Sequence, residues 1–208
     1  MTLRRQPLQA RSRARIDQIL DAADQVFLEM GYDAATTNHI AARAGVSIGG
    51  LYRFFPDKDA LLVALAERYG AKMAALGAEV TTPDQPGLTL AERVGRGIDA
   101  FNALLVAHPG FQTLIEQARH PALVAGLQAQ DAGMSGLIGG TLLHLRPKMD
   151  PAERAIIATV TNLVLGTLQT LSLRGDDAHR AAVVAEAKVM VSADLSRRLG
   201  IPEDVPLS

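Results

Sequence analysis

The stretch from Thr37 to Phe55, TNHIAARAGVSIGGLYRFF, leaves the chain little conformational choice. Two short helix-forming runs flank Gly45, and glycine readily takes the left-handed backbone conformation that a sharp turn needs. Small alanines before the turn would let two helices approach closely, and apolar residues after it would fill their interface. The stretch therefore predicts two short helices that cross steeply, the second running from Ile48 to about residue 54.

Apolar residues at helical spacing surround this stretch on both sides. Steps of three and four between residues 16 and 30 predict a helix that ends at Gly31, and residues 1–11 before it are expected to be unstructured. After the stretch, Pro56 ends the short helix and Asp57 caps a long fourth one. That helix is expected to end in the loop-forming sequence TTPDQPG, residues 81–87.

Helical patterns fill the rest of the chain, and most are bounded by proline or glycine. They cover about 88–107, 111–118, 122–145, 151–173 and 177–199. Alanine and leucine dominate and β-branched runs are few, which favours helix over sheet. The expected fold is all-α, with about nine helices in an N-terminal three-helix helix-turn-helix domain and a C-terminal helical domain. The expected boundaries are 1–11 for a basic arm, 12–57 for the helix-turn-helix and 58–208 for the remainder, with the fourth helix as connector.

Composition excludes several classes of function. The chain has no cysteine, which removes disulfides, thiolate metal sites and a thiol nucleophile. It also lacks GxSxG, P-loop and HExxH motifs, and its histidines at 108, 120 and 144 have no metal-binding spacing. We therefore expect no cofactor and no metal, and a helical enzyme is the weaker alternative. The net charge of −1 disfavours a protein that coats nucleic acid non-specifically.

Charge is nevertheless concentrated at the N-terminus, where residues 1–16 contain five arginines and no acid. Such an arm could contact phosphates, or it could be a solvated, disordered tail. No apolar stretch follows it as a signal peptide would require. Arg, Asp, Gln or His interrupts each apolar run, so no segment is expected to span a membrane. A cytoplasmic protein is expected.

The segment from Ile16 to Tyr69 resembles the N-terminal DNA-binding domain of TetR/AcrR-type repressors. The segment is about a quarter of the chain, and its matching pieces are ILDAADQVFLEMGY, ATT, IAARAGVSIGGLYRFF and PDKDALL. The resemblance implies a homodimeric repressor that binds double-stranded palindromic operator DNA and is released by a small molecule. An activator of the same build is the alternative that the sequence leaves open.

The exposed face of the short helix after Gly45 would enter the major groove. Two glycines there suggest close approach of the backbone to DNA, although a frayed turn would also tolerate them. Thr36 and Thr37 can both cap the helix before the turn, and the resemblance implies that Thr37 caps it and, like Ser47, meets a phosphate. It implies a phosphate contact for Lys58 as well. Arg53 is the candidate for base readout, because its guanidinium can donate two hydrogen bonds to guanine. The predicted DNA contacts are Thr36, Thr37, Ser47, Ile48, Gly49, Tyr52, Arg53 and Lys58.

The remaining chain carries no specific motif, and by family analogy it binds an effector and forms the dimer. The last two helices are expected to pair across a two-fold axis through small and branched residues, although an ordinary core would use many of the same positions. Apolar residues with a few polar ones among them suggest a hydrophobic or weakly polar effector, although each could be a core or interface residue. The pocket candidates are Phe101, Leu105, Phe111, Gln112, Ile115, Met134, Ile138, Thr141, Asn162, Leu165 and Gln169.

Overall fold

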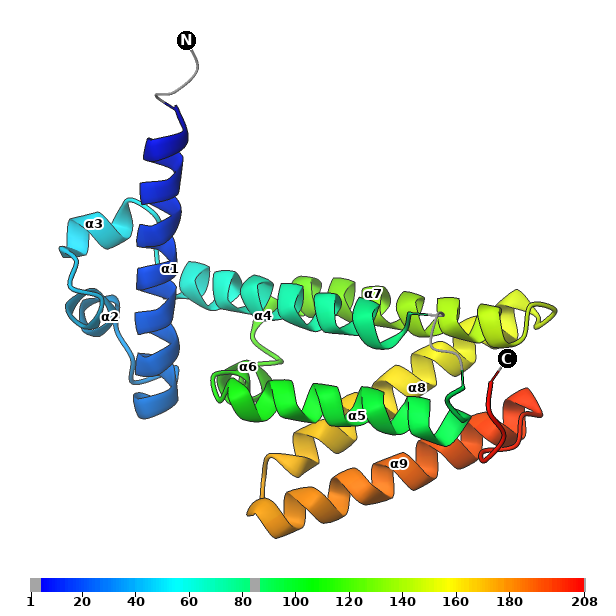
Figure 1. The fold of residues 1–208 in the computed structure, drawn as a ribbon. Coiled ribbons are helices and arrows are strands. Elements are labelled where there is room, and N and C mark those ends of the chain that lie inside the picture. Colours follow the sequence, from blue (N-terminus) through cyan, green and yellow to red (C-terminus); the bar gives the residue numbers. More distant parts are fainter. Residues whose placement is uncertain (1–4, 83–86, 208) are drawn as a thin grey trace. The chain divides into compact units, whose positions relative to one another are not determined.

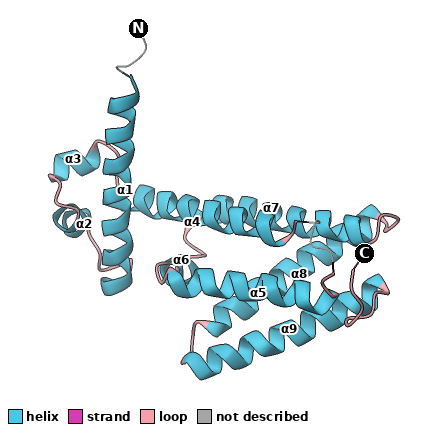
Figure 2. Ribbon diagram, viewed as in Figure 1, coloured by secondary structure: helices cyan, strands magenta, loops and turns pink. Residues whose placement is uncertain are grey.

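The computed structural model describes residues 5–82 and 87–207, apart from the side chains at 5–9, 125, 127, 129 and 169. Within these residues the chain is helical and has no strand, which confirms the all-α prediction (Figure 1, Figure 2). The helices are α1 (Arg5–Met30), α2 (Thr37–Arg43), α3 (Ile48–Tyr52), α4 (Lys58–Val80), α5 (Leu90–Ala107), α6 (Phe111–Glu116), α7 (Pro121–Leu145), α8 (Pro151–Ser172) and α9 (Asp177–Leu199).

The first helix begins earlier than the sequence analysis predicts. The expected disordered arm over residues 1–11 is wrong from Arg5 onward, where α1 starts, and residues 1–4 lie outside the described chain. Gln, Leu, Ala and Arg between residues 5 and 15 are good helix formers. Pro7 falls in the first turn of the helix, where a missing N–H costs nothing. The arginines of this segment therefore lie on a helix.

The chain forms two compact units that are not consecutive in sequence. The first unit contains the chain up to Tyr69 together with Pro109–Leu127, and the second contains Gly70–His108 and the chain from Gln128 onward. The boundary thus lies inside α4 and not after residue 57, where the sequence analysis places it. Residues of α6 and early α7, which the sequence analysis assigns to the C-terminal domain, belong to the first unit.

The first unit is built on contacts of α1 with α2 and of α2 with α3. Its fully buried side chains include Ile19, Phe27, Ile40 and Leu51. Gly31 and Gly45, at the ends of α1 and α2, have φ angles of 75° and 61°. Both are in the left-handed region that favours glycine, as the sequence predicts.

Aromatic contacts explain why α6 belongs to the first unit. The ring of Tyr69 packs against Phe111 with centroids 4.3 Å apart, and its hydroxyl donates to Asp24 Oδ2 at 2.6 Å. Burial and then this hydrogen bond raise the pKa of Tyr69 far above its usual value, so it remains a donor. A Cβ atom at Gly110 would overlap the Asp24 carboxylate and the Tyr69 hydroxyl. Only glycine lets the start of α6 come this close.

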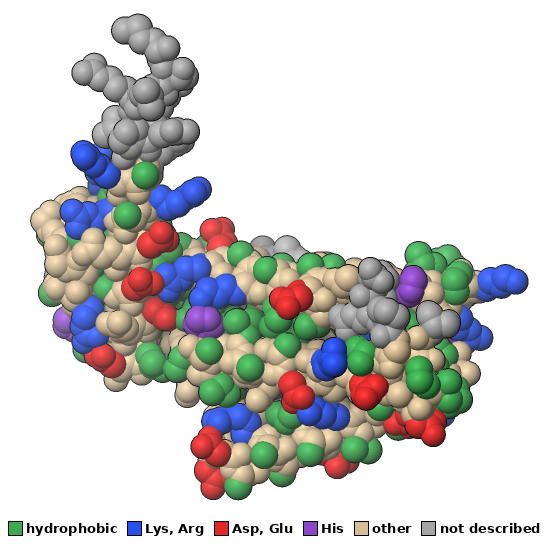
Figure 3. Space-filling model, in the orientation of Figure 1, with side chains coloured by type: hydrophobic (Ala, Val, Ile, Leu, Met, Phe, Trp, Pro, Cys, Tyr) green, Lys and Arg blue, Asp and Glu red, His purple; other side chains and the backbone are tan. Residues whose placement is uncertain are grey.

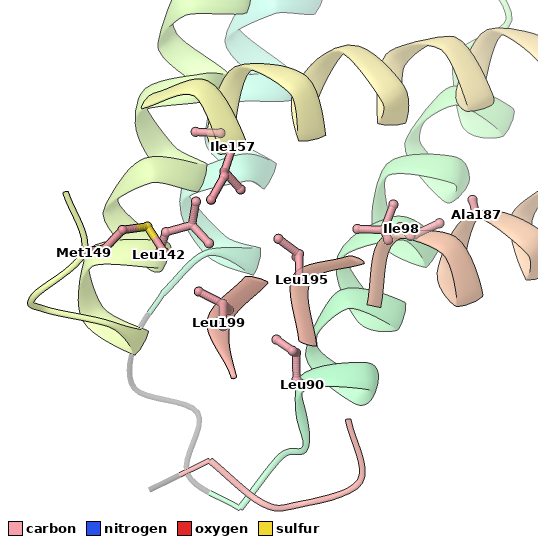
Figure 4. Packing of buried hydrophobic residues seen from close by; sticks show 10 residues of the cluster. Leu90, Ile98, Leu142, Met149, Ile157, Ala187, Leu195 and Leu199 are labelled. Atoms are coloured by element: carbon pink, nitrogen blue, oxygen red, sulfur yellow. The ribbon is translucent and has the colours of Figure 1, made fainter. Parts of the chain in front are cut away.

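The second unit has its core where α9 packs against both α5 and α8. The buried side chains converge from several helices of this unit (Figure 4). A capping box at Thr89 and Glu92 begins α5, since each side chain accepts from the backbone N–H of the other residue. The labelled core residues are Leu90, Ile98, Leu142, Met149, Ile157, Ala187, Leu195 and Leu199.

Helix α8 qualifies the prediction about membranes. Among the described residues, Pro151–Ser172 is long and apolar enough to cross a bilayer by length and composition alone, which is weak evidence. From Ala155 to Ser172, α8 is mostly apolar and its few polar residues are all uncharged, so the single Gln of this stretch does not interrupt the run. The expectation that no segment reaches this length is therefore wrong for α8.

Candidate functional site

The turn between α2 and α3 is held by side-chain caps at both helices. Thr36 is the N-cap of α2, and its hydroxyl accepts from the backbone N–H of His39 at 3.2 Å. The predicted capping role of Thr37 is therefore wrong, because Thr37 is the first residue of the helix itself. Its hydroxyl lies 3.0 Å from that of Tyr52, which joins α2 to α3.

Helix α3 starts as predicted, with Ser47 as a cap that accepts from Gly50 N–H at 3.1 Å. It ends at Tyr52, two residues before the predicted end, and Phe55 turns into the core with 7% of its surface exposed. All four residues of the predicted face are exposed. The four residues are Ile48, Gly49, Tyr52 and Arg53.

Glycine at position 49 has no explanation in the packing of the chain itself. A Cβ atom built there would have no protein atom within 4 Å, since the position faces open space. Alanine would strengthen a helix of this kind by about 1 kcal/mol. This open surface agrees with the prediction that the backbone of α3 comes close to DNA at Gly49. The alternative, a frayed turn that tolerates glycine, is not needed to explain it.

A groove beside α3 adds arginines of the N-terminal segment, for which the sequence left both a phosphate contact and a solvated tail open. It has a volume of about 740 Å³ and lies between the N-terminal half of α1 and the turn. Arg11, Arg15 and Arg53 line it, and none of the described lining residues is acidic. Figure 3 shows basic side chains on both sides of this part of α1. Gln18 also lines the groove, and its amide donates to Ala44 O at 2.8 Å, which joins α1 to the end of α2.

Lys58 is placed differently from the predicted phosphate contact. Its ammonium group donates to the backbone carbonyls of Tyr32, Asp33 and Ala35 at 2.7, 3.2 and 3.1 Å. It also lies 4.3 Å from the centroid of the Tyr32 ring. All three of its protons are thus used within the protein, and the side chain ties the start of α4 to the loop after α1.

We therefore expect Lys58→Met to lower stability and to leave the electrostatics of DNA binding unchanged. Three carbonyls would lose a charged donor, which costs roughly 1.5–3 kcal/mol in the free energy of unfolding. Urea unfolding measures this loss, and the slope of log affinity against log salt measures phosphate contacts. Arg15→Gln is the control, since it should lower that slope by about one without changing stability. A lower slope with unchanged stability in Lys58→Met would instead support the original phosphate role.

A second concave site lies wholly inside the second unit, as a cavity of about 140 Å³. Six of the predicted pocket residues line it, namely Phe101, Met134, Ile138, Thr141, Asn162 and Leu165. Leu105 is buried but is not part of this lining, and the side chain of Gln169 lies outside the described part of the chain. Phe111, Gln112 and Ile115 lie in the first unit, on α6, and do not line the cavity.

Sequence reasoning missed the part of this cavity that comes from α4 and the start of α5. Met73 and Val80 of α4 line it, as do Leu90, Arg93 and Val94 of α5. The periodicity of these helices marks their apolar side, and that signal could have found the leucine and the valines. It could not have found Arg93, because an arginine next to a capping box is typical of a solvated helix end.

Helices α8 and α9 carry large apolar side chains that the second unit leaves exposed. Ile156, Leu163 and Val189 expose 63%, 68% and 62% of their surfaces. The small and branched residues expected in a dimer seam include Ala158 on α8 and Ala187 and Val191 on α9, but these three are buried in the core of the unit. Apart from Ala158, the expected α8 face is exposed, whereas the large exposed apolar residues of α9 are Val189 and Met190.

Two family models match the chain. The model of the bacterial regulatory proteins of the tetR family matches residues 19–65. The model of the tetracyclin repressor-like C-terminal domain matches residues 89–195, which is more than half of the chain. The first match covers α2 and α3 with parts of α1 and α4, and the second covers most of α9 and the cavity residues from α5 onward.

Individual relatives agree with these models. An HTH-type transcriptional repressor of Mycobacterium tuberculosis is 46% identical over 63 residues, which are 30% of this chain and only about a third (34%) of that repressor. An uncharacterized HTH-type transcriptional regulator of the same species is 25% identical over 92% of this chain and 94% of its own length.

A solved structure extends the likeness to the whole fold. It is a TetR-family transcriptional regulator from Streptomyces coelicolor, 27% identical in sequence, with a TM-score of 0.65 over 88% of this chain and 98% of its own. Proteins of this kind regulate transcription and are not enzymes. With its exposed α3, its arginine-lined groove and the match over both units, this chain belongs to the tetR family of DNA-binding transcriptional regulators.

Proposed function

We propose that this protein is a ligand-responsive repressor, which binds a palindromic operator as a homodimer and leaves it when a small, mostly apolar effector fills the cavity. The observation that carries the proposal is the exposed face of α3 beside a groove lined by Arg11, Arg15 and Arg53. Exposed base-reading and phosphate-binding side chains on one surface are what a helix-turn-helix needs. DNA is the partner, and the cytoplasm is the expected location.

Within this interface, the residues divide by chemistry. Arg53 is the base reader, because a guanidinium can donate two hydrogen bonds to guanine O6 and N7. Ile48 and Gly49 allow close apolar contact with the groove. Thr37, Ser47 and Tyr52 present hydroxyls at the phosphate backbone, and Arg11 and Arg15 neutralise phosphates from the α1 side.

The homodimer is supported by the apolar surface that α8 and α9 leave uncovered. Ile156, Val160 and Leu163 follow each other at helical spacing on α8, and Val189 and Met190 are exposed on α9. Large exposed apolar patches are rare on monomers and mark association sites. A two-fold pairing of these helices would present two copies of α3 to two half-sites.

Response to an effector is supported by helix α4, which begins in the first unit at Lys58 and ends in the second at Val80. Met73 and Val80 of this helix line the cavity. A ligand that prefers one position of α4 shifts the population toward the corresponding arrangement of the DNA-binding helices. Release from DNA follows if that arrangement fits the operator less well.

The decisive experiment is selection of DNA from a random pool by the purified protein, followed by sequencing. A dimer of this kind should select a palindrome whose half-site centres are about one helical turn, roughly 34–36 Å, or a multiple of it apart. Selection of a single, asymmetric half-site would contradict the dimer, and no enrichment would contradict operator binding. A promoter–reporter assay with and without the gene then decides between repression and activation, where activation would overturn the repressor proposal.

A further inference from the structure

Arg93 is the one charged residue among the described residues that line the cavity of the second unit. It lies on α5 with only 7% of its surface exposed. Its Nη2 atom donates to the backbone carbonyl of Thr82. Its Nε atom is buried and has no hydrogen-bond partner in the described chain. Within the described chain, this guanidinium therefore has at least one donor without a partner.

No neighbouring acid of the described chain compensates this charge. Glu92, the adjacent residue, accepts from Thr89 N–H at 2.8 Å, and Asp99 pairs with Lys188 at 2.6 Å. Two polar side chains of the cavity already have hydrogen-bond partners. Thr141 donates to backbone carbonyls of Thr81 and Leu137, and Asn162 donates to Asp131 O.

A buried cation without an anion is costly, and an arginine cannot escape the cost by losing its proton. Burial lowers the pKa of Arg93, but the guanidinium is still charged at neutral pH because its usual pKa is so high. Arg93 therefore brings to the wall of a mostly apolar cavity a guanidinium that no acid of the described chain is seen to neutralise. A ligand with one negative charge and an apolar body would satisfy both features.

We infer that the effector is an apolar monocarboxylate whose carboxylate pairs with the Arg93 guanidinium. A planar carboxylate matches the guanidinium fork, and a single anion matches a single cation, whereas a doubly charged phosphate would leave one charge unpaired. The cavity of about 140 Å³ is close to the roughly 150 Å³ that hold a benzene-sized molecule, so the body is a short or medium alkyl chain or one ring. This inference rests on the proposed function of the cavity and specifies its ligand.

Calorimetric titration of the full chain with octanoate and with octanamide tests the charge directly. The two probes have the same chain and differ in the carboxylate. The wild-type protein should bind octanoate roughly 10- to 100-fold more tightly, as expected for a charge-assisted hydrogen bond. Arg93→Met should bind both probes equally, and Arg93→Lys should keep part of the preference. Arg96→Met, an exposed arginine of α5 that does not line the cavity, should keep all of it.

The wild-type comparison decides the matter even if Arg93→Met does not fold. Equal affinity for the two probes, or no binding of octanoate up to its solubility limit, would overturn the monocarboxylate. An unchanged octanoate preference in a folded Arg93→Met would overturn the role of Arg93. Release of selected DNA is measured separately by fluorescence anisotropy. Preferential octanoate binding without release would leave this inference intact and contradict the ligand response of the proposed function.

Discussion

Replacing both Ile156 and Leu163 by aspartate should convert the protein to a monomer and lower its affinity for the selected operator by roughly 100- to 10,000-fold. Both side chains are about two-thirds exposed on α8, so the substitutions should leave the core of the unit unchanged. In a dimer they would place carboxylates in an apolar seam, which is strongly unfavourable. Loss of the second half-site then removes the gain that comes from binding two linked sites at once.

Sedimentation equilibrium and DNA-binding anisotropy measure these two effects. The matched control is Val106→Asp with Leu143→Asp, which alters two exposed apolar residues on α5 and α7 of the same unit. The control should remain dimeric. A dimeric Ile156/Leu163 variant would contradict the proposed seam. A wild-type monomer that sediments with lipid vesicles would instead assign the apolar surface of α8 to a membrane.

Replacing Arg53 by alanine should cost about 1–3 kcal/mol in operator binding and relax the base preference at one position of each half-site. The Arg53 guanidinium lies in the groove beside α3, 5.9 Å from the centroid of the Phe54 ring, and no hydrogen bond within the described chain holds it. It is therefore free to reach a base. The loss should fall on the operator, because a base contact matters only where the right base is present.

Competition between operator and random DNA measures this prediction. Arg15→Gln is again the comparison, since a residue that neutralises a phosphate should weaken both DNAs alike and lower the salt slope by about one. Arg53→Ala should change the ratio of the two affinities, whereas Arg15→Gln should not. Equal weakening of operator and random DNA by Arg53→Ala would remove its base-reading role.

Local chemistry made the helix-turn-helix predictable from sequence. Gly45 and Ser47 specify a turn and a cap through their own backbone and hydroxyl, so their roles do not depend on distant residues. Lys58 shows the limit of this reasoning. Its position at the start of α4 suggests a phosphate contact, but the carbonyls that it binds come from a loop more than twenty residues earlier. Only the folded chain brings them together.

The sequence predicts only about half of the pocket residues correctly, again because contacts between distant segments decide the rest. Residues on α7 and α8 have an apolar pattern, and six of the predicted pocket residues line it. Phe111, Gln112 and Ile115 carry the same pattern but lie on α6, which packs in the first unit around Tyr69. Periodicity marks the apolar side of a helix and does not say which neighbour covers it. Arg93 carries no apolar signal, so burial alone revealed it.

The two compact units alternate along the chain, and this limits how such regulators can change the DNA sequence that they bind. The chain crosses from one unit to the other three times, after Tyr69, after His108 and after Leu127. A single recombination event near residue 70 would exchange the DNA-binding helices of a relative without the α6 segment that packs against Tyr69. We therefore expect that exchange of the DNA-binding unit between relatives requires two segments, residues 1–69 and 109–127. Point substitutions on α3 should alter specificity without disturbing either unit.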